Sequence, residues 1–321
     1  MNNIDGNNGL NAALAKDRKI DLSVTIGSLK LKNPVMLASG TVGYGNEISH
    51  LTDLSRLGAI VTKSLSLKPR KGNPPQRIVE TASGMLNAIG LANVGVECFL
   101  KEKVPFLRQL DTSIICNVAA STYEEYVECV RILTTEETIS AFEINISCPN
   151  VKEGGLVFGN DISAIGRITS AVRAVTAKPL IIKLSPNVHN IASFAQVAKQ
   201  EGADAVSAIN TLVGTAFNIY TRKPKLFNIT GGLSGPAIKP VALAKVLEIK
   251  RNVDIPVIGL GGIMCWQDAV EFMIAGASAV QLGTVNFVNP DCGVQIADSL
   301  SDYCRKMNIS AVSELTGSYI I

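Results

Sequence analysis

Eight short apolar runs, separated by longer amphipathic segments, constrain the fold of this 321-residue chain more than any other feature. The runs are rich in Val and Ile and are apolar nearly throughout, as parallel strands buried on both faces should be. They span residues 34–39, 59–63, 113–118, 141–146, 180–184, 205–209, 256–260 and 278–282. Eight strands that alternate with helices predict an α/β fold, the (β/α)8 TIM barrel, although an open doubly wound sheet has the same periodicity.

The segments around these runs define the domain organisation. Helix-like stretches, such as 123–135, follow several of the runs. Residues 1–18 are polar, so we expect a flexible N-terminal extension there and a single domain over residues 19–321. The alternation on either side of Gly27 and Ser28 predicts an N-terminal β-hairpin. Roughly fifty residues separate the second run from the third, and insertions of that length are usually lids or binding loops.

Composition excludes several classes of function. A net charge of +3, with 18% charged residues and no basic stripe, gives no support for binding to nucleic acid or to a membrane surface. The sequence has no apolar run of about 18 residues and no secretory signal at its start. The seven cysteines are scattered without a CxxC pair, which argues against a disulfide framework, a zinc site or an iron–sulfur cluster. We therefore expect a cytoplasmic protein.

In a TIM barrel the chemistry gathers at the carboxyl ends of the strands. Polar side chains and glycines recur at these positions: Ser39, Lys63, Ser64, Asn117, Asn145, Lys183, Asn210, Thr211, Gly261, Gly262, Gly283 and Thr284. The glycines follow strands seven and eight, where exposed backbone N–H groups commonly bind phosphate, and Gly235 is placed to add another donor. Without a dinucleotide fingerprint or a P-loop, the pattern indicates a mononucleotide phosphate rather than bound NAD. The alternative is that these are simply turn glycines.

Two lysines, Lys63 and Lys183, stand at the ends of apolar strands and should point into the barrel mouth, where a cation needs an anionic partner. A flavin, which gains negative charge on reduction, would meet this need. An internal ion pair is the alternative, because Glu143 lies on the same strand face as Asn145. A Schiff-base lysine at Lys183, as in aldolases, is a second alternative.

Cys148 follows the fourth run and precedes Pro149, which places it in a turn rather than in the core. Most single cysteines are small hydrophobic residues, but this one has amide side chains on both sides and is followed by Gly154 and Gly155, a pattern that fits a lid. A thiol can remove a proton when its surroundings favour the thiolate. Because no histidine stands at a strand end, a base fits Cys148 better than a nucleophile paired with histidine.

Several of these segments together resemble class 1 dihydroorotate dehydrogenases. The segments that carry the resemblance are Lys63-Ser64-Leu65-Ser66, 69–74, 85–93, 145–150, 182–187, Ile209-Asn210-Thr211 and 259–262. The resemblance runs from Asp21 nearly to the C-terminus, and the Asn-x-Ser-Cys-Pro-Asn motif is its most specific part. The Asn-Ala-Ile-Gly-Leu form at residues 87–91 is most like class 1B, the NAD-linked branch, whereas Gln76 stands where the family often has proline.

The resemblance implies oxidation of dihydroorotate to orotate in de novo pyrimidine (UMP) biosynthesis, with FMN as the cofactor of this chain. It implies that Cys148 is the catalytic base, which removes the C5 proton while hydride passes from C6 to N5 of FMN. The implied substrate-binding residues are Lys63, Asn87, Ala88, Ile89, Gly90, Leu91, Asn145, Asn210 and Thr211. The implied FMN-binding residues are Ser39, Lys63, Ser64, Asn117, Asn145, Lys183, Ile209, Gly235, Gly261, Gly262, Gly283 and Thr284.

The resemblance also implies partners. A class 1B chain forms a homodimer and associates with an electron-transfer subunit that carries FAD and a [2Fe–2S] cluster, giving a heterotetramer that delivers electrons to NAD+. We expect no metal site in this chain itself. The alternatives are a related FMN barrel that acts on another pyrimidine, a Schiff-base aldolase or lyase that uses Lys183, and a non-catalytic barrel.

Overall fold

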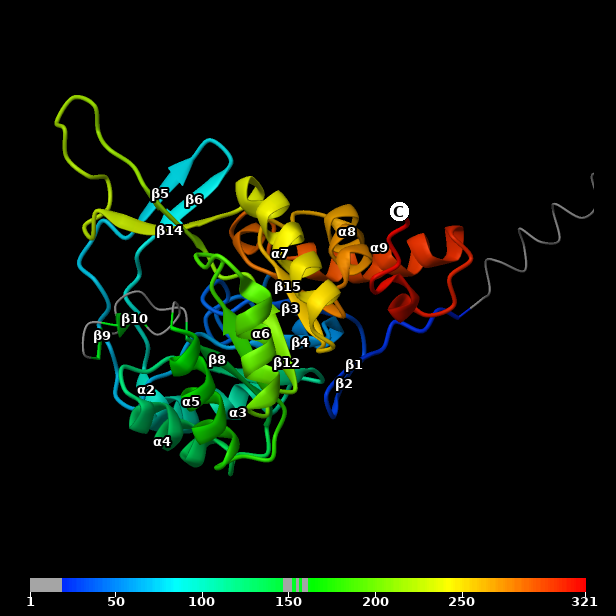
Figure 1. Ribbon diagram of the computed structural model, residues 1–321, viewed down its shortest axis with the longest axis horizontal. Helices are drawn as coiled ribbons and strands as arrows, with labels where there is room; N and C mark the ends of the chain where they lie inside the picture. The colour runs from blue at the N-terminus through cyan, green and yellow to red at the C-terminus, as the bar shows by residue number, and fades with distance from the viewer. Residues whose placement is uncertain (1–18, 147–151, 154–155, 158–160) are drawn as a thin grey trace, which may run out of the picture.

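The computed structural model describes residues 19–146, 152–153, 156–157 and 161–321. The expected extension over residues 1–18 and the predicted base Cys148 lie outside the described residues. Eight parallel strands close into a barrel in the order β11-β12-β15-β16-β3-β4-β7-β8 (Figure 1). These strands are β3 (Val35–Leu37), β4 (Ala59–Val61), β7 (Ser113–Val118), β8 (Ile139–Asn145), β11 (Leu180–Leu184), β12 (Ala205–Ala208), β15 (Val257–Leu260) and β16 (Ala279–Leu282). The closed barrel confirms the predicted TIM barrel and excludes the open sheet.

Helices surround the barrel and alternate with its strands (Figure 1). They are α2 (Gly95–Cys98), the π-helical η2 (Phe99–Lys103), α3 (Val104–Leu107), α4 (Tyr123–Leu133), α5 (Ile162–Arg173), α6 (Ile191–Gln200), α7 (Lys239–Asn252), α8 (Trp266–Ala275) and α9 (Cys292–Lys306), with short 3-10 turns η1 (Leu54–Arg56), η4 (Pro236–Ile238), η5 (Thr284–Phe287) and η6 (Val312–Leu315). The side chains of Thr122, Asp161 and Asn190 accept backbone N–H groups at the starts of α4, α5 and α6. Such caps satisfy donors that have no partner within the helix and so fix where each helix begins.

The predicted N-terminal hairpin is confirmed, and it lies at the amino end of the barrel. Strand β1 (Val24–Ile26) pairs antiparallel with β2 (Leu29–Leu31) around Gly27, whose φ is +58°. A Cβ at Gly27 would lie 2.7 Å from the Cβ of Asp204, the residue just before β12. Only glycine lets the hairpin turn approach the start of that strand so closely.

Backbone hydrogen bonds join the N-terminal part of the domain to its C-terminal part. The N–H of Asp21 donates to the carbonyl of Ser310 at 3.0 Å, and the carbonyl of Asp21 accepts from Val312 at 2.8 Å. The barrel itself closes between β16 and β3, which are the last and the first barrel strands in the sequence. Closure of the barrel therefore joins the beginning of the domain to its end.

A second, four-stranded antiparallel sheet, here called the outer sheet, stands away from the barrel at the upper left of Figure 1. Strands β5 (Ile78–Thr81) and β6 (Gly84–Asn87) come from the insertion between β4 and β7. Strands β13 (Leu212–Thr215) and β14 (Thr230–Ser234) come from an insertion after β12, and β14 pairs with β6. Two insertions thus build one sheet, whereas the sequence predicts only the first of them.

Two short strands, β9 (Lys152–Glu153) and β10 (Leu156–Val157), form a separate pair after β8. Within the part of the chain that the structure describes, no helix has both the length and the apolar character needed to cross a membrane. The same residues contain no group of three or more His, Cys, Asp or Glu side chains arranged to hold a metal ion.

Candidate active site

Side chains from several barrel strands meet at the carboxyl end of the barrel, here called the mouth. Asn145, the last residue of β8, accepts a hydrogen bond from Asn210 after β12, with 3.3 Å between Nδ2 and Oδ1. Lys183 on β11 stands opposite Asn145 across the two paired strands. On the other side of the mouth, the hydroxyl oxygens of Ser39 and Ser64 lie 3.5 Å apart. Predicted site residues from distant parts of the sequence therefore come together here.

A fully buried carboxylate, that of Glu143, occupies the barrel interior just below the mouth. It accepts hydrogen bonds from Asn117, Lys183, Ser207 and Gln281. The 3.4 Å contact with Lys183 is the internal ion pair that the sequence left open. Among the described residues, Oδ1 of Asn117 and Oε1 of Gln281 are buried without a hydrogen-bond partner. A ligand with an N–H donor would satisfy such an oxygen.

Lys63 lies half-buried two residues after the end of β4. Its backbone N–H donates to the carbonyl of Gly43 at 2.8 Å, which holds the strand end against the loop after β3. Burial lowers the pKa of Lys63, because removing the ammonium from water disfavours its charged form; Glu47 opposes this effect and Arg77 adds to it. A cation in this situation favours an anionic ligand, because pairing offsets the cost of burial.

Three loops meet to form a backbone-lined cradle at the mouth. The glycine cradle comprises Gly235, Gly261, Gly262 and Gly283. A Cβ at Gly262 would lie 2.9 Å from the carbonyl oxygen of Gly235, and φ at Gly262 is +85°. By contrast, a Cβ at Gly283 would meet nothing closer than 3.9 Å, so the space beside it is open. Thr284 donates to the hydroxyl of Ser234 at 2.8 Å and joins two of the loops. Bare backbone N–H groups gathered in this way suit a phosphate.

The predicted substrate residues 87–91 lie where the outer sheet meets the mouth. Asn87, at the end of β6, donates from Nδ2 to the carbonyl of Gly232 on β14 at 3.2 Å. Thr211 approaches the same glycine so closely that a Cβ at Gly232 would lie 2.1 Å from its Oγ1. Strand β14 therefore brings Asn87 and Thr211 together. The loop continues through Ala88, Ile89, Gly90 and Leu91.

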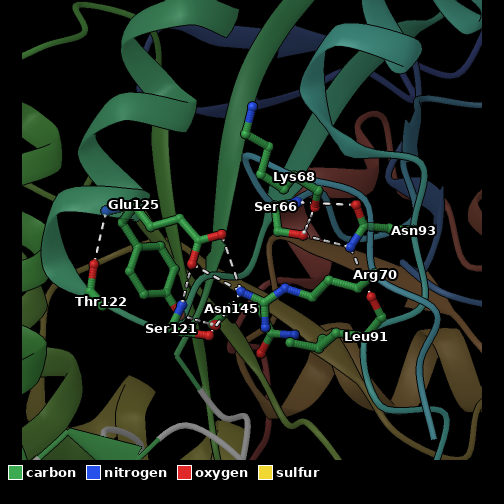
Figure 2. A network of polar contacts seen from close by, with 10 residues as sticks. Ser66, Lys68, Arg70, Leu91, Asn93, Ser121, Thr122, Glu125 and Asn145 are labelled. Carbon is green, nitrogen blue, oxygen red and sulfur yellow. Dashed lines mark hydrogen bonds and ion pairs between the residues drawn. The ribbon is translucent and has the colours of Figure 1, made fainter.

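A polar network ties the insertion after β4 to the start of α4, as Figure 2 shows. Arg70 pairs with Glu125 at 2.9 Å. Backbone hydrogen bonds of 3.0 Å in both directions join Arg70 to Asn93, which closes the base of the loop that carries residues 87–91. The neighbour of Glu125, Tyr126, donates from its hydroxyl to the carbonyl of Asn145 at 2.8 Å. The network thus links the substrate loop to the strand that carries Asn145.

The described residues of the predicted site lie at the mouth or on the loop of residues 87–91, except Asn117, which lies beside Glu143 just below the mouth. Buried Ile209 borders the glycine cradle, since a Cβ at Gly261 would lie 3.3 Å from its Cγ1. Sequence analysis missed the residues behind the site, such as Glu125. The spacing of Thr122 and Glu125, which fits a helix start, was an available signal. Another was the presence of the polar residues Ser207 and Gln281 inside otherwise apolar runs.

The fold and the site define a TIM-barrel enzyme with a glycine cradle and a lysine-containing mouth. A family model described as dihydroorotate dehydrogenase matches residues 21–303. The chain therefore belongs to the dihydroorotate dehydrogenase family, as the sequence motifs had suggested.

Curated relatives named dihydroorotate dehydrogenase B (NAD(+)), catalytic subunit, align over nearly the whole chain. The relative from Geotalea daltonii is 55% identical over 300 residues, which is 94% of this chain and 98% of the relative. The relative from Trichlorobacter lovleyi is 54% identical over 297 residues, 92% of this chain and 98% of the relative. The relative from a Thermoanaerobacter species is 51% identical over 299 residues, 93% and 99% respectively. These relatives confirm the resemblance to class 1B.

Proposed function

We propose that this chain is an FMN-binding catalytic subunit that oxidises dihydroorotate to orotate in de novo pyrimidine (UMP) biosynthesis. One observation carries the proposal: the glycine cradle and the paired amides of Asn145 and Asn210 share one barrel mouth. A cradle alone would serve any phosphate ligand, and amides alone would serve many polar ligands. Their combination suits a mononucleotide cofactor beside a pyrimidine, and the family membership agrees with it.

The residues present fit FMN. The glycine cradle offers backbone N–H groups to its phosphate. Oδ1 of Asn117 is a buried acceptor without a partner among the described residues, which suits the ring N–H of a flavin. The ammonium of Lys183 suits a ring that gains negative charge on reduction. The other residues proposed to contact FMN are Ser39, Lys63, Ser64, Asn145, Ile209 and Thr284. When bound, FMN would supply a two-electron acceptor at its N5 for the hydride that leaves C6 of dihydroorotate.

The substrate is proposed to bind between the mouth and the loop of residues 87–91. Amides donate and accept hydrogen bonds, so Asn87, Asn145 and Asn210 match the urea-like edge of a dihydropyrimidine. Half-buried Lys63 is suited to pair with the substrate carboxylate. The backbone of residues 88–91 and the side chain of Thr211 would complete the enclosure. Exclusion of water by this loop would strengthen each of these contacts.

Cys148 is proposed to remove the C5 proton of dihydroorotate. General bases typically contribute about 10²- to 10⁴-fold to a rate. We therefore expect Cys148→Ala to bind FMN and orotate but to slow flavin reduction by dihydroorotate within about that range, as measured by anaerobic stopped-flow absorbance. Cys98→Ala, at a half-exposed cysteine on α2, is the matched control and should reduce its flavin at the wild-type rate. A wild-type rate in Cys148→Ala would refute the assignment.

The electrons are proposed to leave through a partner subunit that carries FAD and a [2Fe–2S] cluster and reduces NAD+. The relatives' name, catalytic subunit with NAD(+), supports this arrangement. We further propose a homodimer of this chain, which with two electron-transfer subunits forms a heterotetramer in the cytoplasm. Exposed apolar side chains on and near the outer sheet, such as Val213, Ile219 and Tyr220, support the homodimer.

The test of the proposed function is an anaerobic visible spectrum of the purified chain, before and after addition of dihydroorotate. We expect a flavin spectrum that bleaches, because hydride transfer removes the absorbance of oxidised flavin. A flavin spectrum that persists with dihydroorotate but bleaches with another dihydropyrimidine would reassign the substrate. A chain that stays colourless even after addition of FMN would refute the cofactor and favour a lyase that uses Lys183.

A further inference from the structure

The carboxylate of Glu143 is fully enclosed, one layer below the mouth of the barrel. Glu143 lies on β8 two residues before Asn145, so both side chains face inward. A buried carboxylate is costly unless hydrogen bonds and a cation compensate for lost water. Donors from four other strands, β7, β11, β12 and β16, supply that compensation.

The two oxygens of this carboxylate have different kinds of partner. Oε2 accepts from the hydroxyl of Ser207 and from Nε2 of Gln281, both at 2.8 Å. Oε1 accepts from Nδ2 of Asn117 at 2.6 Å and from the ammonium of Lys183 at 3.4 Å. Asn117 and Lys183 are both proposed to contact FMN. One oxygen therefore anchors the carboxylate, while the other contacts the side chains that would hold the cofactor.

The carboxylate of Glu143 determines the orientation of the side-chain amide of Asn117. An ionised carboxylate accepts hydrogen bonds and cannot donate them. Asn117 must therefore direct its NH2 group toward Glu143, which leaves Oδ1 on the opposite side. That oxygen is buried and has no hydrogen-bond partner among the described residues. The amide is thus presented as an acceptor, the orientation that a ring N–H requires.

We propose that Glu143 is a positioning residue for the flavin, an inference that rests on the proposed binding of FMN. It fixes Asn117 with its carbonyl toward the ring, and it holds Lys183 beside the ring. Its negative charge also offsets the charge of Lys183. Since a reduced flavin carries negative charge, an ion-paired lysine stabilises it less than a lone lysine would. Glu143 thereby keeps the reduction potential of the bound flavin low.

Two substitutions separate orientation from charge. Glu143→Gln removes the charge but keeps an acceptor for Asn117. It can do so because its NH2 group can face the hydroxyl of Ser207 and Oε1 of Gln281, an oxygen without a partner among the described residues. Glu143→Asp keeps the charge, but its side chain is one methylene shorter, so the carboxylate lies farther from Asn117 and Lys183. Each variant is prepared as full-length chain, freed of flavin and titrated with FMN by fluorescence quenching. The midpoint potential of the bound flavin is then measured anaerobically against reference dyes.

We expect both variants to bind oxidised FMN more weakly, because each weakens the charge-assisted hydrogen bond that orients Asn117; the loss should be about tenfold in Glu143→Asp. Glu143→Gln should also bind reduced flavin at least about tenfold better relative to oxidised flavin, which raises the two-electron potential by about 30 mV. Glu143→Asp should raise the potential less, since its charge is kept. A residue that only supports the fold would leave the potential unchanged.

Glu248→Gln is the matched control. Glu248 accepts a hydrogen bond from the N–H of Ile191 and pairs with Lys245, both at 2.9 Å, among the outer helices α6 and α7. Its substitution removes the same charge and a comparable ion pair outside the barrel. FMN affinity and flavin potential should both remain at the wild-type values.

Wild-type affinity and potential in Glu143→Gln would overturn the inference and leave the proposed function intact. If that variant does not fold, as judged by circular dichroism, Glu143→Asp decides the question by the same titration: wild-type affinity for FMN would overturn the inference. A wild-type chain that binds no FMN would overturn the proposed cofactor, and with it this inference. The two failures are therefore distinguishable.

Discussion

Lys63 illustrates how burial prepares a single side chain for a ligand. The residue follows β4 at the mouth, where burial lowers the pKa of its ammonium, Arg77 lowers it further and Glu47 counteracts part of the change. Pairing with a carboxylate would favour the protonated form and so raise the pKa again. Binding of an anionic substrate and protonation of Lys63 are therefore coupled.

This coupling predicts a pH dependence of orotate binding. The protonated lysine attracts the carboxylate, so affinity should be full below the lowered pKa and should decline as the pH rises through it. The decline should begin below the value near 10.4 of an ordinary lysine. The affinity for orotate is measured by titrating the flavin spectrum with orotate at a series of pH values from neutral to about 10. Lys63→Met should bind orotate weakly and show a smaller decline over this range, whereas a wild-type decline no larger than that of Lys63→Met would contradict the coupling.

The residues at the strand ends could be predicted from sequence because the signal is local. Lys63, Asn145 and Lys183 each interrupt or end an apolar run, and a parallel barrel gathers all such positions at one mouth. The partners that tune them could not be predicted. Glu47 and Arg77 belong to loops whose course depends on packing of the whole chain. Cys148 lies outside the described residues, so its predicted role stays a prediction.

At the scale of elements, the glycine cradle makes distinct predictions for two of its members. Gly283→Ala adds a methyl group into open space, so the unfolding temperature should hardly change while FMN affinity falls about tenfold, as expected for the loss of one good contact. In Gly262→Ala the added methyl group would clash with the carbonyl of Gly235, at a backbone position whose φ is +85°. This variant should therefore lose FMN affinity and also destabilise the fold by about 1–3 kcal/mol. Thermal unfolding of the apoprotein and FMN titration measure the two effects. Unchanged FMN affinity in Gly283→Ala would place the phosphate elsewhere.

The elements of the barrel could be predicted, but those of the outer sheet could not. Runs buried on both faces identify barrel strands such as Ser113–Val118 and Leu180–Leu184, whose observed bounds match the predicted ones. Strands β13 and β14 are half-exposed and rich in glycine, so their residues carry no clear apolar period. The pairing of β14 with β6 also joins segments that are remote in sequence, and it depends on the folded barrel that brings the two insertions together.

At the scale of the whole molecule, one region exposes an unusual amount of apolar surface. The apolar patch lies on the outer sheet and on the segment between β13 and β14, and comprises Ile78, Val213, Phe217, Ile219, Tyr220, Phe227 and Ile229. Ile219 is 79% and Tyr220 is 89% exposed. Exposed apolar groups gathered in this way are typical of protein contacts. A second copy of this chain, as proposed for the homodimer, would cover them.

Charge placed in the apolar patch should therefore separate the dimer. We expect Ile219→Asp to raise the dimer dissociation constant at least about thirtyfold, the effect of losing a strong interface contact. Sedimentation velocity across a range of concentrations measures it. Ile320→Asp is the matched control, because Ile320 is 97% exposed near the C-terminus, far from the outer sheet in Figure 1, and should leave assembly unchanged. A wild-type sedimentation profile in Ile219→Asp would remove the patch from the interface.

The pairing of β16 with β3, the last and the first barrel strands, has a consequence for the synthesis of the chain. During synthesis β3 leaves the ribosome first among the barrel strands, yet its partner on one side is not complete until residue 282 has been added. The hydrogen bonds of Asp21 to the segment around Ser310 form later still. A nascent or truncated chain would thus present two bare strand edges, the kind of surface on which β-proteins aggregate. Completion of the last strand removes both edges at once.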